Sequence, residues 1–103
     1  MSTETIGEKL RQLREQNELP LRKVAAMLDI DVAILSKMER GERKITKEVV
    51  LKLADIYKYH ADDLLILFLS DRIMYEIQDE ELGEKALKLA EKRVKYLKAK
   101  KKK

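Results

Sequence analysis

The chain has 103 residues, of which 45% are hydrophobic and 41% are charged, enough for one small domain plus an extension. Its net charge of +4 comes from the C-terminal third: residues 1–70 hold 12 basic and 12 acidic residues, whereas residues 71–103 hold 11 and 7. The absence of cysteine excludes disulfides and thiolate metal sites. The N-terminus lacks the apolar run of a signal peptide, and the apolar run 64–69 is too short to cross a membrane. We therefore expect a soluble, cytosolic protein.

Residues 6–17 are predicted to form the first helix. Thr5 and Glu8 have the spacing of a capping box at its start. Gly7 inside a helix costs up to about 1 kcal/mol, and close packing of a neighbouring helix is one reason to keep it there. The apolar stripe expected to face the core comprises Ile6, Leu10 and Leu13.

Two short helices, at about 21–28 and 32–40, are predicted next, joined by a tight turn. Pro20 suits the first turn of a helix, Asp31 is a good N-cap, and Gly41 fits the left-handed position that follows a helix end. This succession of elements predicts a helix-turn-helix, a motif that places its second helix in the DNA major groove.

The outer face of the second of these helices is slim and positive toward one edge. Spacing at 100° per residue separates this face from the apolar side formed by Ile34, Leu35 and Met38. Residues 20–47 carry seven basic and four acidic residues, so positive charge surrounds this face. Spacing alone leaves open whether the face reads DNA or is an ordinary solvated surface. Its members are Val32, Ala33, Ser36, Lys37 and Arg40.

A further helix is predicted over residues 47–58, with Thr46 as its cap. The cations Arg43, Lys44 and Lys47 lie where a loop and a helix start can reach the DNA backbone, or they form a solvated loop. His60 is the only histidine, so we expect no metal site. The core-facing stripe of this helix is Val50, Leu53, Ala54 and Tyr57.

The next helix, from about residue 61 to 78, is apolar on every side over residues 64–69. One face can close the core, and the others need a cover. The chain's own C-terminal helix and a second copy of the protein are expected to cover them together; the alternative is packing within the chain alone. We favour a homodimer that uses this helix. The expected interface comprises Ile66, Leu67, Phe68, Leu69, Ile73 and Ile77.

The last helix is predicted to begin near residues 79–81 and to end at about Leu97. This helix carries an apolar stripe, and the sequence reveals no ligand pocket in it. Residues 71–97 are therefore interpreted as a helical extension that serves assembly, and we expect it to take part in dimerisation. Residues 98–103, with five lysines, are expected to be disordered. The tail either attracts phosphates without specificity or keeps the chain soluble.

Several short pieces in a fixed order give the chain a family resemblance. It resembles the phage repressor and Cro type of helix-turn-helix, also called the XRE family, over roughly residues 5–66. The resemblance implies an all-α fold with a five-helix repressor-like domain at 1–70 and the helix-turn-helix at about 21–40. The matching pieces are residues 6–15, Leu19, Val24-Ala25, the run Leu35-Ser36-Lys37-Met38-Glu39-Arg40-Gly41-Glu42-Arg43, Leu53-Ala54 and Asp62-Asp63-Leu64-Leu65.

The resemblance also has consequences for individual residues. It implies that Arg14 and Glu39 form a partly buried ion pair linking the first helix to the end of the reading helix; the alternative is two independent surface charges. The chain departs from the family at Pro20-Leu21, where the family usually has Ser or Thr followed by a phosphate-binding Gln. Leu21 cannot make that contact, and Arg22 and Lys23 are expected to replace part of it.

We therefore expect a transcriptional regulator that binds double-stranded DNA as a homodimer on an inverted repeat, in the bacterial cytosol or nucleoid. Base edges are read by Val32, Ala33, Ser36 and Lys37. Phosphates are held by Arg22, Lys23, Arg40, Arg43, Lys44 and Lys47. No catalytic constellation, cofactor or small-molecule effector is expected. A phage-type repressor, an antitoxin-like autoregulator and a restriction–modification controller remain open. The alternative is a protein–protein adaptor that keeps the fold without reading DNA.

Overall fold

The computed structural model describes residues 4–101, and every regular element in that range is an α-helix. The six helices are α1 (Ile6–Gln16), α2 (Leu21–Leu28), α3 (Val32–Glu39), α4 (Lys47–Ile56), α5 (Ala61–Ile77) and α6 (Gly83–Lys101). The expected all-α class is confirmed. The chain divides into two compact units, one through Asp71 and one from Arg72 onward.

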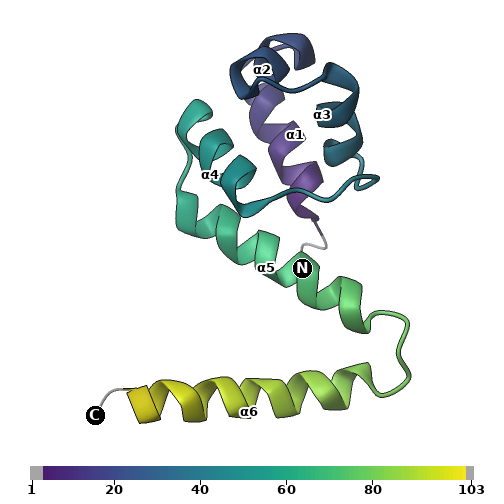
Figure 1. Ribbon diagram of the computed structural model, residues 1–103, viewed down its shortest axis with the longest axis vertical. Coiled ribbons are helices and arrows are strands. Elements are labelled where there is room, and N and C mark those ends of the chain that lie inside the picture. Colours follow the sequence, from purple (N-terminus) through teal and green to yellow (C-terminus); the bar gives the residue numbers. More distant parts are fainter. Residues whose placement is uncertain (1–3, 102–103) are drawn as a thin grey trace. The chain divides into compact units, whose positions relative to one another are not determined.

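The first unit is built around a single apolar core to which α1–α5 all contribute, with α1–α4 gathered over the first turns of α5 (Figure 1). The apolar stripes predicted for α1 and α4 point into this core. The fully buried members of the core include Leu10, Val24, Leu35, Val50, Leu53 and Leu64.

Local side-chain contacts fix where the helices begin. The Glu8 backbone N–H donates to Thr5 Oγ1 at 3.1 Å and the Thr5 N–H donates to Glu8 Oε1 at 2.9 Å, which completes the predicted capping box of α1. Asp31 accepts from the Ala33 N–H at 3.1 Å to cap α3. Each cap satisfies backbone N–H groups that have no partner within the helix.

Left-handed residues end several helices and turn the chain toward the next one. Gly41, just past α3, has φ +77°, as predicted. Glu18, Asp29 and Lys58 adopt the same region with φ between 52° and 57° although each carries a side chain. A side chain in this conformation costs about 1–2 kcal/mol, so packing on either side of these turns stabilises them.

The C-terminal unit differs from the sequence expectation. α6 continues through Lys101, so residues 98–101 are helical rather than disordered; Lys102 and Lys103, the rest of the predicted tail, lie outside the described residues. Lysine is a good helix former and its charge is favourable at the negative end of a helix. Within this unit, a Cβ at Gly83 would lie 2.5 Å from the Ile77 carbonyl oxygen, so only glycine allows this close approach. None of the described helices has the length and apolar character of a membrane span.

Candidate nucleic-acid interface

Helix α3 is attached to the first unit along one side and exposed along the other. Leu35 is 1% exposed, and Met38 and Glu39 are also buried. On the opposite side Val32 is 43% exposed, and Ala33 and Lys37 are exposed as well. The structure therefore places three of the four predicted base-reading residues on an outward surface, and it half-buries the fourth, Ser36.

The C-terminal end of α3 is held against α1 by two contacts. A Cβ on Gly7 would lie 2.6 Å from the carbonyl oxygens of both Met38 and Glu39, so α1 approaches the α3 backbone as closely as a glycine permits. Beside it, Arg14 donates to the Glu39 carboxylate through Nε at 2.8 Å and Nη2 at 3.1 Å. The position of α3 therefore depends on α1 as well as on its own apolar side.

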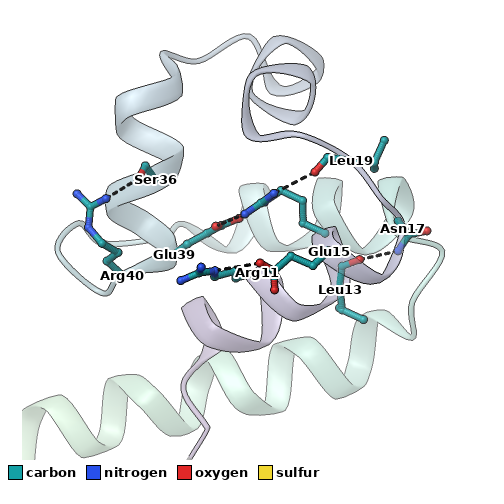
Figure 2. A network of polar contacts seen from close by, with 9 residues as sticks. Arg11, Leu13, Glu15, Asn17, Leu19, Ser36, Glu39 and Arg40 are labelled. Carbon is teal, nitrogen blue, oxygen red and sulfur yellow. Dashed lines mark hydrogen bonds and ion pairs between the residues drawn. The ribbon is translucent and has the colours of Figure 1, made fainter.

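The Arg14–Glu39 ion pair is largely buried. The two side chains are 11% and 5% exposed, and Arg14 Nη1 also donates to the Leu19 carbonyl at 3.0 Å; Figure 2 shows Glu39 and Leu19 at the two ends of this chain of contacts. The hydrogen bond to Glu39 raises the pKa of Arg14. The pair joins α1, the α1–α2 turn and α3.

Arg40 at the end of α3 is engaged by its own neighbours. Its guanidinium donates to both carboxylate oxygens of Glu42, at 2.9 and 3.2 Å. It also donates to the Ser36 hydroxyl (Figure 2). The hydrogen bond from Arg40 lowers the pKa of Glu42. Sequence reasoning missed Glu42, although an acid two residues from a proposed phosphate-binding arginine was a visible signal. The Glu42 carboxylate thus accepts from the guanidinium N–H groups of Arg40 that can also bind a phosphate.

The other predicted phosphate-binding cations lie on three segments. Arg22 and Lys23 are in the first turn of α2, Arg43 and Lys44 follow α3, and Lys47 begins α4; all five are exposed. The α2 start has no acidic residue and no side-chain cap. Leu21, where the chain departs from the family pattern, packs against the core. It therefore contributes to the fold instead of to the surface.

The predicted dimer surface needs correction at one residue. Phe68 is only 5% exposed and belongs to the core of the first unit, so it is not available to a partner. Leu67 is half-buried against the same core, and Ile77 is half-buried. Ile66, Leu69 and Ile73 are 66%, 52% and 46% exposed. Of the six residues predicted for the interface, these last three therefore remain exposed to a partner, beside the exposed Met74 and Tyr75 of the same helix.

The same α5 makes one polar contact that the sequence did not reveal. Asp71 Oδ2 accepts from the Ile6 backbone N–H at 2.8 Å, which places a carboxylate at the positive N-terminus of α1. The two residues are 65 positions apart, so no local spacing could predict the contact. Among the described residues there is no group of three or more His, Asp or Glu side chains placed to hold a metal.

Comparisons with known proteins agree with this geometry. The family model described as helix-turn-helix matches residues 10–64, just over half of the chain. A transcriptional regulator of Deinococcus deserti, DdrOP3, is 38% identical over 58 residues, which cover 56% of this chain and 45% of that protein. A transcriptional repressor of Bacillus subtilis, RghR, is 33% identical over 63 residues, or 60% of this chain and 47% of its own. The chain thus spans somewhat under half the length of these relatives.

No solved structure matches the chain at a comparable level of significance. The matched region begins within α1 and includes α2, α3 and α4, so it contains the exposed face of α3 and the Arg14–Glu39 pair that holds this helix. The chain belongs to the helix-turn-helix family of the phage repressor and Cro, or XRE, type.

Proposed function

We propose that the protein is a transcriptional regulator that binds specific double-stranded DNA through α3 as a homodimer. The observation that carries this proposal is the outer face of α3, which combines small or slender side chains with cations while the rest of the helix is anchored. The names of the two relatives, a transcriptional regulator and a transcriptional repressor, support the same function. The repressor relative favours repression over activation.

The exposed residues of α3 suggest a division of contacts. Val32 and Ala33 offer apolar contact to thymine methyl groups, and Lys37 donates to guanine O6 and N7. Ser36 is already hydrogen-bonded to Arg40, so these two act together at the edge of the groove. The base contacts determine sequence preference.

Phosphate contacts come from the surrounding cations. The first turn of α2 has no side-chain cap and no acidic residue, and it carries Arg22 and Lys23, which makes it a favourable place for a phosphate. Arg43, Lys44 and Lys47 flank the other end of α3. These contacts position the protein on the duplex and make binding salt-dependent.

The homodimer is supported by the apolar residues that α5 leaves exposed. Ile66, Leu69 and Ile73 share one side of this helix at spacings of three and four residues. A two-fold dimer would present two copies of α3 to half-sites about one DNA turn apart.

The test is selection of bound sequences from a random duplex pool by the full chain. We expect an inverted repeat whose half-sites lie about one helical turn apart. Lys37→Ala should weaken binding to the selected site more than to random DNA, whereas Arg43→Ala should weaken both alike and reduce the salt slope by about one. Lys85→Ala, which removes the same charge from the C-terminal unit, is the control. An unchanged preference in Lys37→Ala would refute the proposed readout.

A protein–protein adaptor is the second candidate. It is favoured by Leu21, which packs inward where the family binds phosphate, and by Glu42, which neutralises Arg40. If folded protein selects no sequence and shows no salt-dependent retention on DNA, the adaptor replaces the regulator.

A further inference from the structure

Helix α6 carries an apolar stripe that nothing covers within its own unit. Beyond Gly83, every described residue of the helix is exposed, including Leu89 at 58%, Val94 at 55% and Leu97 at 54%. Helical spacing gathers the apolar residues on one side and most of the charged residues on the other. The members of the stripe are Ala86, Leu87, Leu89, Ala90, Val94, Tyr96 and Leu97. Such a surface on a helix of 19 residues is typical of one that packs against a partner helix.

The charges along this unit are separated by sign. Residues 76–84 contain five acidic residues and no basic one, whereas residues 92–101 contain six basic residues and no acidic one. Of these acidic residues only Glu84 belongs to α6, and Asp79, Glu80 and Glu81 lie in the turn just before it. Two copies of α6 placed parallel would set their basic ends side by side. Placed antiparallel, the basic end of each copy lies beside the acidic start of the other, which favours that orientation and disfavours the parallel one.

The apolar stripe also determines which residues of two antiparallel α6 helices lie opposite each other. An antiparallel pair centred on Ala90 places Ala86 opposite the partner's Val94, so small side chains meet larger ones. In the same register Glu84, in the first turn of α6, lies near the partner's Lys95 and Lys98. The apolar and the charged patterns therefore call for one and the same alignment.

We propose that α6 pairs antiparallel with α6 of a second copy of this chain, with Ala90 at the two-fold axis. This inference deepens the proposed homodimer and rests on it, and it adds a specific second interface and its orientation. An anionic membrane surface or DNA would suit the basic end alone, because both would repel the five carboxylates of residues 76–84.

Cysteine cross-linking tests the alignment directly, since the native chain contains no cysteine. Under mild oxidation of the full chain, Ala90→Cys should form a disulfide-linked dimer. Leu97→Cys should not, because residues 97 of two antiparallel copies lie about 21 Å apart along the helix axis at 1.5 Å per residue. Ala99→Cys, off the stripe, is the background control.

Either of two results would overturn the proposal. Efficient cross-linking of both Ala90→Cys and Leu97→Cys would indicate a parallel pair. Cross-linking of neither, in a chain that sedimentation shows to be dimeric, would assign the dimer to another surface such as α5. No DNA is present in this assay, so its failure is separate from a failure of DNA recognition.

Charge reversal gives an independent test. The triple variants Glu80→Lys/Glu81→Lys/Glu84→Lys and Lys95→Glu/Lys98→Glu/Lys100→Glu should each self-associate at least about tenfold more weakly than the native chain. An equimolar mixture of the two should recover association, which shows that the single variants had not merely lost their helix. Undiminished self-association of both variants, or monomeric native protein that binds anionic vesicles instead, would contradict the pairing.

Discussion

Arg14 and Glu39 hold together the parts of the chain that position α3. Their carboxylate–guanidinium contact is bidentate and nearly buried, unlike the Arg11–Glu15 pair, whose side chains are 60% and 57% exposed. Desolvation makes the loss of one partner costly, because the other remains as an uncompensated buried charge. The resemblance to the family predicted this pair; composition and spacing alone did not, because the two residues lie 25 positions apart.

Arg14→Ala should therefore lower the free energy of unfolding by about 3–5 kcal/mol. Arg11→Ala, on the same helix, should cost well under about 1 kcal/mol. Chemical denaturation followed by circular dichroism measures both. The paired replacement Arg14→Met/Glu39→Leu should recover much of the loss; equal costs for the two single alanine variants would refute the special role of the buried pair.

Tyr57 places a hydroxyl in the core without a hydrogen-bond partner among the described residues. Burial, reinforced by the nearby Glu39 charge, raises the pKa of this hydroxyl. The unfolded chain then loses the proton near pH 10 while the folded protein keeps it. Titration of this group therefore leaves the free energy of unfolding unchanged below pH 10 and lowers it as the pH rises further.

Tyr57→Phe should leave stability at pH 7 unchanged or raise it by about 1 kcal/mol, since an unsatisfied buried hydroxyl is removed. Above pH 10 the variant should also lose stability less steeply than the native protein, by up to about 1.4 kcal/mol per pH unit. Urea denaturation from pH 8 to 11 checks this, with the exposed Tyr75→Phe for comparison. Parallel pH profiles would contradict the assignment.

Glu42 holds the Arg40 guanidinium, so in the proposed complex it would compete with DNA phosphate. Glu42→Gln should release the guanidinium, tighten binding to random duplex DNA several-fold and steepen the salt dependence by about one released ion. Glu15→Gln removes an equally exposed carboxylate from another arginine pair and controls for net charge. Fluorescence anisotropy over a range of salt concentrations measures both. A Glu42→Gln protein with native affinity and slope would show that Arg40 does not reach phosphate.

At the scale of the helices, apolar spacing and caps predicted the ends of α1–α5 to within two residues. Helix α6 begins at Gly83 and not near residues 79–81, and it ends at Lys101 and not at about Leu97. Prediction from the sequence was less successful for the burial pattern of α5. Its run 64–69 is apolar on all sides, so no polar face marks which residues turn inward, and the burial of Phe68 could not be predicted. The contact of Asp71 with the N-terminus of α1 also depends on the packed fold, because the two residues that make it lie 65 positions apart.

The approach of α1 to α3 can be tested at Gly7. Alanine is the better helix former by about 1 kcal/mol, yet its Cβ would clash with two backbone carbonyls that cannot turn aside. Gly7→Ala should therefore destabilise the protein by about 1–3 kcal/mol, measured by denaturant unfolding. Gly41→Asn, at a left-handed position with open space, should cost much less. A stabilised Gly7→Ala variant would mean that the two helices can separate at no cost.

At the scale of the whole molecule, two copies must act together if the DNA site is an inverted repeat. Deleting one half-site from the selected duplex should weaken binding by more than about tenfold, because the second contact is then lost from an already assembled dimer. Electrophoretic mobility shift measures this, with a duplex of equal length carrying both half-sites as reference. Equal affinity for both duplexes would indicate that the protein binds DNA as independent monomers.

The distribution of charge along α6 has a consequence for how assembly proceeds. Glu84 lies in its first turn and Lys98, Lys100 and Lys101 lie in its last turn, so these terminal side chains oppose the macrodipole of the backbone. The exposed pairs Glu84–Lys88 and Glu91–Lys95 add local support. The proposed pairing would therefore be the docking of two helices that are already formed, because much of the entropy of ordering α6 is lost before the copies meet.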